Sequence, residues 1–216
     1  RKDMLKMNIQ SVYNQLHETR IIPVLKIRDA KKAVPLARAL QEGGLPAAEV
    51  TFRTEAAEES IRSIARELPE VCVCAGTVLT PHQAEQAVNA GAKAIISPGT
   101  NLETVKWCIA HEIPVIPGCA TPTEVEACMR LGLSLVKLFP AEVVGGVAML
   151  KALHGPYSSM QFMPTGGIKP QNVREYLSLP NVWCCGGTWL APDSALESED
   201  YDTIRALAHE ASGLCR

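Results

Sequence analysis

The feature that most constrains the fold is a regular alternation of short apolar runs with longer stretches of helical character. Along the 216-residue chain, the apolar runs begin every 20 to 26 residues, which is the length of one strand–turn–helix unit. We expect strands near residues 21–27, 47–52, 71–75, 93–97, 113–116, 134–139, 160–164 and 182–185. Alternating strands and helices predict a parallel sheet, and eight units predict that the sheet closes into a barrel.

The stretches between the apolar runs are rich in Ala, Glu and Arg, as helices are. They include residues 30–42, 56–67, 81–90, 102–112 and 122–131, and both Thr80-Pro81 and Thr121-Pro122 are typical helix starts. The sequence thus predicts an α/β protein with a single (β/α)8 TIM barrel over residues 21–216, preceded by an N-terminal leader helix within residues 1–20. A doubly wound open sheet is the alternative, although no G-x-G-x-x-G follows the first strand.

Composition narrows the class of partner. The net charge is −2, and the acidic and basic residues are interspersed, which does not favour binding to nucleic acid or to an anionic membrane. No apolar run approaches the ~20 residues that span a bilayer, so we expect a cytoplasmic protein that acts on a small molecule. The eight cysteines form no pair of C-x-x-C motifs, and we expect reduced thiols and neither a metal nor a cofactor.

Two of the predicted strands carry charged residues at positions that would be buried inside a barrel. In the second strand, alternation places Glu49, Thr51 and Arg53 on one face, and burying such groups is costly unless they pair with each other or with a ligand. A structural ion pair between Glu49 and Arg53 is the simpler alternative. The guanidinium of Arg53 also suits a substrate carboxylate.

In the sixth strand, Lys137 stands among apolar neighbours, with the parity of Leu135 and Phe139. Burial disfavours a charged ammonium and favours a free amine that can attack a carbonyl. The alternatives are a lysine that extends its amine to solvent or one that pairs with Glu49 for structural reasons. We take Lys137 as the candidate reactive residue.

The ends of three further strands supply candidate binding groups. Alternation in the third strand groups Thr77 with Val73 and Ala75, and its hydroxyl would orient a carboxylate or a water. The seventh and eighth strands end in Thr165-Gly166-Gly167 and Gly186-Gly187-Thr188. The loops after these strands are the usual phosphate site of such barrels, while two tight turns without a ligand are the alternative. Pro98, which follows the fourth strand, is an expected pocket wall.

Several ordered motifs together resemble a known family, the bacterial 2-dehydro-3-deoxy-6-phosphogluconate (KDPG) and 4-hydroxy-2-oxoglutarate (KHG) aldolases. The motifs are EVTFRTE from Glu49, AGTVL from Ala75, ISPG from Ile96, VKLFPAE from Val136, PTGGI from Pro164 and CGGTW from Cys185. The resemblance runs from about Ile21 to the C-terminus.

The resemblance implies a class I, metal-independent aldolase without a cofactor. It implies that Lys137 forms the Schiff base with the substrate ketone and that Glu49 is the general acid and base. Further implied roles are the binding of the pyruvyl carboxylate by Arg53 and Thr77, pocket walls at Phe139 and Pro98, and phosphate binding by Gly166, Gly167 and Gly187. At the Thr188 position the family commonly has serine, and its members are typically homotrimers.

The implied reaction is cleavage of KDPG to pyruvate and glyceraldehyde 3-phosphate, with pyruvate and glyoxylate as a second product pair from KHG. Relatives that act on the galactonate epimer use the same lysine, so the choice of epimer stays open. A phosphosugar isomerase or synthase on the same barrel would share the glycine loops without needing Lys137. A phosphate-binding barrel without catalysis is the third alternative.

Overall fold

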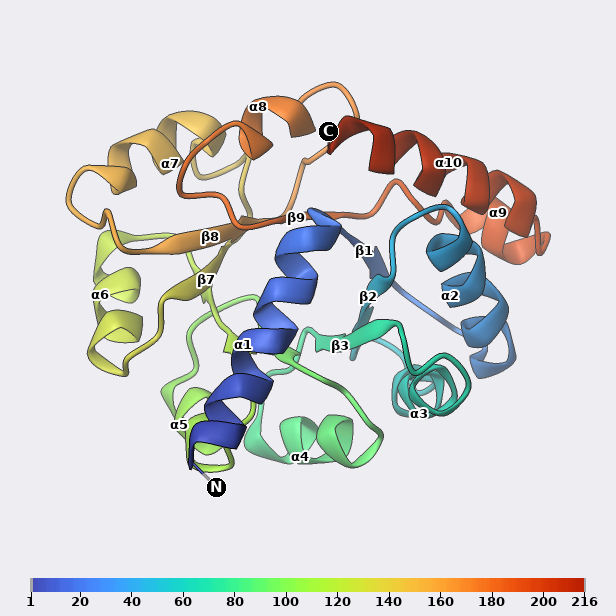
Figure 1. The fold of residues 1–216 in the computed structure, drawn as a ribbon, viewed down its shortest axis with the longest axis horizontal. Coiled ribbons are helices and arrows are strands. Elements are labelled where there is room, and N and C mark those ends of the chain that lie inside the picture. Colours follow the sequence, from blue (N-terminus) through green and yellow to red (C-terminus); the bar gives the residue numbers. More distant parts are fainter. Residues whose placement is uncertain (1, 216) are drawn as a thin grey trace.

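Parallel strands form the centre of the fold, and helices surround them (Figure 1). The computed structural model describes residues 2–215. Its strands are β1 (Ile21–Leu25), β2 (Ala47–Thr51), β3 (Cys72–Gly76), β4 (Ile95–Ile96), β5 (Val115–Ile116), β6 (Gly118–Cys119), β7 (Leu135–Leu138), β8 (Gln161–Pro164) and β9 (Cys185–Gly187). The result is an α/β fold with a curled parallel sheet.

The strand order follows the chain. One sheet has the order β5-β4-β3-β2-β1-β9, and a second has the order β6-β7-β8. Two isolated parallel bridges, Phe162 with Val182 and Thr165 with Gly186, link the β8 segment to the β9 segment. The first and last strands of the chain, β1 and β9, are direct neighbours.

Helices follow the strands in nearly every connection. Their bounds are α1 (Lys2–Thr19), α2 (Ala33–Glu42), α3 (Ala57–Glu67), α4 (Pro81–Asn89), α5 (Leu102–Ala110), α6 (Pro122–Arg130), α7 (Gly146–His154), α8 (Val173–Leu177), α9 (Asp193–Glu197) and α10 (Tyr201–Leu214), with a 3-10 helix at Ala30–Lys32. Thr80 and Thr121 cap α4 and α6 by accepting hydrogen bonds from Gln83 N and Glu124 N. Both helices begin with proline, as the sequence indicates.

The fifth strand continues past its expected end at Ile116, with an interruption. Pro117 separates β5, which pairs with β4, from β6, which pairs with β7. The carbonyl of Pro117 still accepts a 2.8 Å hydrogen bond from Lys137 N, so the chain stays in register while changing its pairing partner. Gly118 is required here, because a Cβ atom at this position would lie 2.1 Å from the Pro98 carbonyl oxygen.

Side chains of the strands pack in two layers. Those on the outer face, such as Val50 and Val73, pack under the helices. Those on the inner face form a separate buried cluster, which Val12 and Leu16 of α1 complete. The strand residues of this inner cluster are Ile22, Ala47, Cys72, Cys74, Ala94, Ile96, Ile116, Leu135, Met163 and Cys184.

Helix α1 lies across the strands (Figure 1) and is anchored by its polar groups as well as by packing. The Tyr13 hydroxyl donates to Val115 O (3.2 Å), and the Trp183 indole donates to Tyr13 O (2.7 Å). At the junction with β1, Arg20 donates from its guanidinium to backbone carbonyls, including that of Leu177 at 2.7 Å. These contacts fix one end of the strand assembly, and the cavity described below lies at the other.

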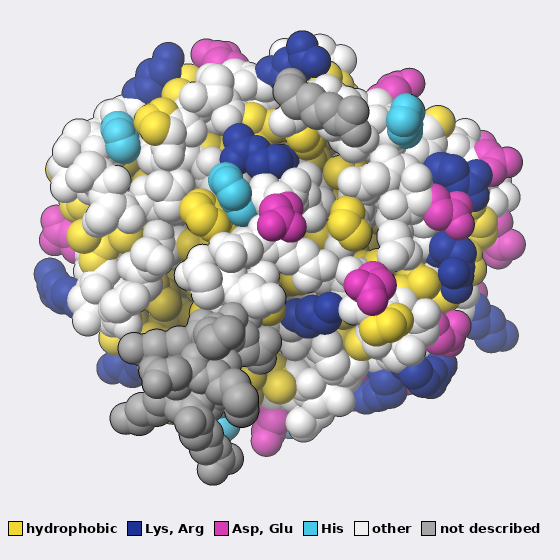
Figure 2. Space-filling model, viewed as in Figure 1, with side chains coloured by type: hydrophobic (Ala, Val, Ile, Leu, Met, Phe, Trp, Pro, Cys, Tyr) yellow, Lys and Arg dark blue, Asp and Glu magenta, His cyan; other side chains and the backbone are white. Residues whose placement is uncertain are grey.

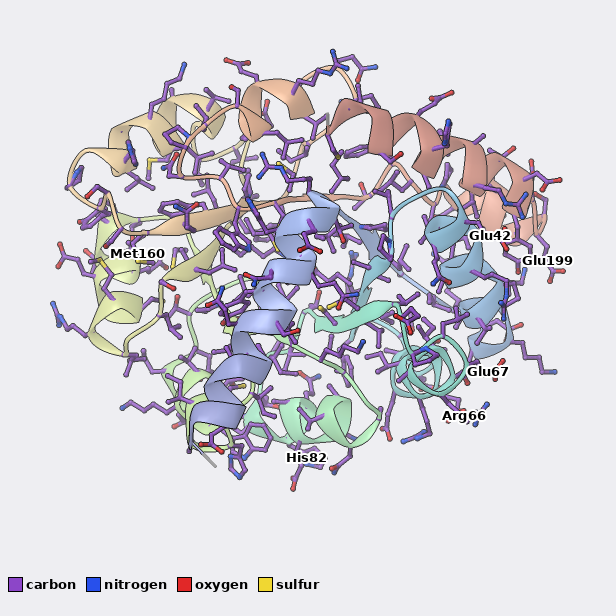
Figure 3. The ribbon with its side chains drawn as sticks, in the orientation of Figure 1. Glu42, Arg66, Glu67, His82, Met160 and Glu199 are labelled. Atoms are coloured by element: carbon purple, nitrogen blue, oxygen red, sulfur yellow. The ribbon has the colours of Figure 1, made fainter. Side chains whose placement is uncertain are left out.

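Charged side chains are spread over the surface of the molecule (Figure 2). Acidic and basic groups are interspersed on the face that Figure 2 shows. In Figure 3, Glu42 extends outward from α2, and its carboxylate accepts a 2.7 Å hydrogen bond from Arg205 of α10. Within residues 2–215, none of the helices combines the length and hydropathy needed to cross a bilayer.

Candidate active site

A cavity of about 130 Å³ lies at the carboxyl ends of the strands. It is lined by Val24, Glu49, Thr51, Arg53, Thr77, Pro98, Lys137, Phe139, Thr165, Gly166, Gly167, Ile168, Gly186 and Thr188. Ten of the eleven candidate residues from the sequence are in this set. The eleventh, Gly187, is not.

Lys137 and Glu49 meet inside this cavity. The Lys137 side chain is on the inner face of β7, as its alternation with Leu135 indicates, and the residue is only 4% exposed. Its Nζ donates a 3.1 Å hydrogen bond to Oε1 of the fully buried Glu49. Nζ also lies 5.3 Å from the centre of the Phe139 ring, a distance at which an ammonium is attracted to the ring face.

The remaining oxygen of Glu49 is free to contact a ligand. Among the described residues, no hydrogen-bond partner satisfies Glu49 Oε2, which is buried. A buried, unsatisfied oxygen is costly. Glu49 therefore has one oxygen on the lysine and one available to exchange a proton with a bound molecule.

Thr51 and Arg53, the other polar residues predicted on the Glu49 face, have different roles. Thr51 Oγ1 donates a 2.9 Å hydrogen bond to Leu25 O and so joins β2 to β1. Arg53 follows the strand, and within the part of the chain that the structure describes, Glu49 forms its ion pair with Lys137 and not with Arg53. The alternative of a structural ion pair between Glu49 and Arg53 is wrong, and Arg53 lines the cavity.

Thr77 reaches the cavity by a route that strand alternation does not describe. Cys72 and Cys74 lie on the inner face of β3, whereas Val73 and Ala75 lie on the outer face. Regular alternation would therefore turn Thr77 outward. Its backbone instead adopts φ +55°, and this left-handed conformation returns the side chain to the cavity.

Gly76, on the inner face of the same strand, leaves room for Glu49. A Cβ atom at position 76 would lie 2.2 Å from Glu49 Oε1, far inside van der Waals contact. The glycine of the Ala75-Gly76-Thr77 motif thus has a steric role that its sequence position alone did not reveal.

The turn after β8 presents backbone to the cavity. Gly166 and Gly167 have φ of +102° and +80°, a conformation that side chains disfavour. Thr165 precedes them, and no residue of the described chain satisfies its buried hydroxyl with a hydrogen bond. Backbone amides in such consecutive turns form concave sites that suit anions.

Of the two glycines in β9, Gly186 and not the expected Gly187 lines the cavity. Gly186 lines the cavity, and a Cβ atom there would lie 2.4 Å from Thr165 Oγ1. At Gly187 a Cβ atom would lie 2.1 Å from the Trp189 ring, so this residue faces the outer packing. Thr188, the next residue, lines the cavity.

Among the side chains that the structure describes, no group of three or more His, Cys, Asp or Glu residues could hold a metal ion. The cysteines of the inner cluster lie beneath the Lys137–Glu49 pair. Burial raises the pKa of the Cys184 thiol well above its usual range, and the charge of Glu49 adds to the effect. The Cys184 thiol therefore stays protonated, and the other members of this layer are mostly aliphatic side chains.

Comparison with known proteins now identifies the family. A family model described as KDPG and KHG aldolase matches residues 12–207. The chain belongs to this aldolase family. The resemblance inferred from the motifs is confirmed, and the chain is a lyase of the KDPG aldolase type.

Individual relatives of the aldolase agree over most of its length. A KHG/KDPG aldolase of Escherichia coli is 49% identical over 88% of this chain and 90% of that protein. A KDPG aldolase of Legionella pneumophila, with pyruvate captured at low pH as a covalent carbinolamine, is 39% identical and superimposes with a TM-score of 0.89, covering 92% of this chain and 96% of that one. The Zymomonas mobilis KDPG aldolase, solved with 3-phosphoglycerate, has the same identity and TM-score and covers 96% of both chains.

Two residues that line the cavity of this aldolase were not singled out from the sequence: Val24 and Ile168. Val24 shares the inward parity of Ile22 in β1, so alternation was a usable signal. Gly186, from the Gly186-Gly187-Thr188 motif, shares the inward parity of Cys184. It must be glycine because Thr165 occupies the space that a side chain would need.

Proposed function

We propose that this chain is a class I aldolase that cleaves KDPG to pyruvate and glyceraldehyde 3-phosphate, and KHG to pyruvate and glyoxylate. The observation that carries the proposal is the buried Lys137 Nζ, 3.1 Å from Glu49 Oε1, at the inner end of the cavity. The E. coli relative is named for both substrates. The carbinolamine in the L. pneumophila structure supports covalent chemistry with pyruvate.

Formation of the imine requires several proton movements, and Glu49 is placed for each. Lys137 gives a proton to Glu49 and attacks the C2 ketone with its free electron pair, which leaves a positive nitrogen and a C2 alkoxide. Glu49 passes its proton to the alkoxide and takes one from the nitrogen, and this gives the neutral carbinolamine. Glu49 then returns a proton to the C2 hydroxyl, which leaves as water while the nitrogen lone pair forms the imine. The short Nζ–Oε1 contact is suited to these transfers because donor and acceptor are already within hydrogen-bond distance.

Cleavage follows from the electron demand of the imine. Glu49 removes the proton of the C4 hydroxyl, the C3–C4 bond breaks, and its electron pair moves toward the protonated imine to give a neutral enamine. The aldehyde leaves, C3 of the enamine is protonated, and water hydrolyses the resulting imine to pyruvate and free Lys137. The apolar layer beneath Lys137 excludes water from its inner side.

The two ends of the substrate are assigned by charge. Arg53 and Thr77 are proposed to bind the carboxylate, because a guanidinium and a hydroxyl suit a planar anion. The backbone of Gly166 and Gly167, with Thr188, is proposed to bind the phosphate, while Pro98 and Phe139 form the walls. Thr165 adds a free buried hydroxyl between the ends. Gly187 stays a sequence prediction, with support only for its neighbours.

The architecture and assembly belong to the same proposal. Counting β5 and β6 as one interrupted strand, the two sheets and the bridges between the β8 and β9 segments support an eight-stranded (β/α)8 barrel, with α1 as its leader. A homotrimer is proposed from the family resemblance, and its mass in solution, measured by light scattering, tests it. A cytoplasmic location is proposed on the same basis.

The direct test is an assay of purified protein with KDPG, in which released pyruvate is followed through lactate dehydrogenase. The proposal expects turnover of KDPG, slower turnover of KHG, and weak or no turnover of the galactonate epimer. Preference for the epimer would reassign the substrate. Binding of KDPG without release of pyruvate would favour a phosphate-binding protein, and isomerised product would favour an isomerase.

A further inference from the structure

We propose that Glu142, held in place by Tyr176, is a positioning residue for the Gly166–Gly167 turn and thereby sets the affinity for the phosphate end of the substrate. The inference rests on the proposed function, because it concerns the phosphate end of the cavity. Neither residue lines the cavity. Glu142 ends the VKLFPAE motif, and Tyr176 lies on α8, 34 residues later.

The turn needs support from outside because its own backbone is permissive. Gly166 and Gly167 both have positive φ. Glycine adopts positive φ about as readily as negative φ, so its backbone alone does not select this conformation. Without neighbours to fix it, such a turn would sample several conformations and present its amides to a phosphate only part of the time. The surroundings must therefore select the bound conformation.

Glu142 contacts the turn through both its backbone and its side chain. Its amide donates a 3.1 Å hydrogen bond to Gly166 O. Its side chain packs against Gly167, because a Cβ atom on that glycine would lie 2.4 Å from Glu142 Cγ. On the other side, Asn172 Nδ2 donates a 3.0 Å hydrogen bond to Gly167 O. The turn is thus held between Glu142 and Asn172.

Tyr176 fixes the side chain of Glu142. Tyr176 is 1% exposed, and its hydroxyl donates a hydrogen bond to Glu142 Oε1. A Cβ atom on Gly146 would lie 2.6 Å from the Tyr176 hydroxyl and 2.8 Å from that oxygen, so the space around the pair is closed. Glu142 is otherwise exposed, and without the hydroxyl its side chain would be free to leave Gly167 for solvent.

The role of Glu142 is steric, because its charge opposes phosphate binding. A carboxylate near a bound phosphate repels it, and a turn selected for charge alone would carry a lysine or arginine here. Burial, and then the hydrogen bond to Glu142, raise the pKa of Tyr176 far above its ordinary value, so the phenol stays a donor under assay conditions. Glutamine should therefore replace Glu142 well, whereas alanine should not.

The experiment compares Glu142→Ala, Glu142→Gln and Tyr176→Phe with the wild type. For each protein, KM and kcat are measured with KDPG, and the half-saturating concentration of pyruvate is measured by borohydride trapping at the lysine. Tyr157→Phe is the matched control, because it removes another tyrosine–glutamate hydrogen bond, 2.9 Å to Glu126, that does not contact the turn.

The expected result separates the two ends of the substrate. Glu142→Ala and Tyr176→Phe raise KM for KDPG by roughly 3- to 10-fold, the range that one hydrogen bond accounts for. Half-saturation by pyruvate, which has no phosphate, stays unchanged. Glu142→Gln and Tyr157→Phe stay within about 2-fold of the wild type in both measurements.

Four results would overturn the inference. An unchanged KM for KDPG in both Glu142→Ala and Tyr176→Phe would remove the positioning role, and an equal weakening of pyruvate trapping would show a general loss of structure. Tighter KDPG binding in both Glu142 variants would show that charge decides. Wild-type protein that does not cleave KDPG would overturn the proposed function as well, so the two failures are distinguishable.

Discussion

Lys137 and Glu49 lie 88 residues apart in the chain, yet Lys137 Nζ donates a 3.1 Å hydrogen bond to Glu49 Oε1 inside the cavity. β7 carries the lysine and β2 carries the acid, so the pair exists only because the curled sheet brings the inner faces of distant strands together. The layer of side chains below the pair is apolar. Lys137 and Glu49 therefore rely on each other to compensate their buried charges.

Replacement of the lysine should abolish the reaction. Lys137→Ala removes the group that forms the imine, so we expect nearly all turnover to be lost. It also leaves Glu49 buried without its partner, which costs about 3–5 kcal/mol of stability. Turnover and denaturant unfolding measure the two effects, with Lys93→Ala as control, since Lys93 Nζ donates a hydrogen bond to Pro69 O and does not line the cavity. Turnover at the wild-type level in Lys137→Ala would refute the lysine mechanism.

Glu49→Gln should slow the chemistry while leaving the shape of the cavity. The amide cannot exchange the protons of the carbinolamine and the C4 hydroxyl, so kcat should fall by roughly 10²- to 10⁴-fold. The matched control is Glu85→Gln on the exposed face of α4, which should not change kcat. A decrease of less than about 3-fold in Glu49→Gln would mean that another group moves the protons.

Gly76→Ala should affect the reaction without removing any catalytic group. The new methyl group would lie 2.2 Å from Glu49 Oε1, so the carboxylate must move away from Lys137. A displacement of about 1 Å can reduce turnover by roughly 100-fold. Gly213→Ala is the control, because nothing lies within 4 Å of a Cβ atom there. Equal kcat values for the two variants would show that the position of Glu49 is not critical.

The anchoring of α1 should weaken in strong alkali. Burial raises the pKa of Tyr13 to about 12, from 10.0 for an ordinary tyrosine. Because the folded-state value is the higher one, the contribution of Tyr13 to stability is complete below about pH 10 and is lost as the pH rises toward 12. The free-energy difference between wild type and Tyr13→Phe should therefore shrink across this range in urea unfolding. A constant difference would mean that the phenol is not buried.

Chelation should have no effect on activity. The proposed mechanism uses the protonated imine, and no metal, to accept electrons from the breaking bond. Activity measured after dialysis against EDTA should equal that of the untreated protein. Loss of activity that returns on addition of a divalent cation would contradict imine catalysis.

Much of the site could be predicted from the sequence because strand alternation is a local rule. Parity alone placed Glu49, Arg53 and Lys137 toward the cavity, and the motif after β8 placed Gly166 and Gly167 there. These predictions needed only the period of a strand and the position of its end.

The remainder depended on features without a local signature. Thr77 enters the cavity through a left-handed backbone conformation, against the alternation of β3. Pro117 divides the fifth strand between two partners. The ion pair of Glu49 goes to Lys137 instead of Arg53, because the contact between two distant strands decides it.

The central claim is that Lys137 is the residue that bonds covalently to the substrate. Mass spectrometry of the protein after borohydride reduction with pyruvate, followed by peptide mapping, tests it most directly. The account predicts one stable pyruvate adduct on the peptide that contains Lys137, and no adduct in Lys137→Ala. An adduct on another lysine, or no adduct with protein that still cleaves KDPG, would contradict it.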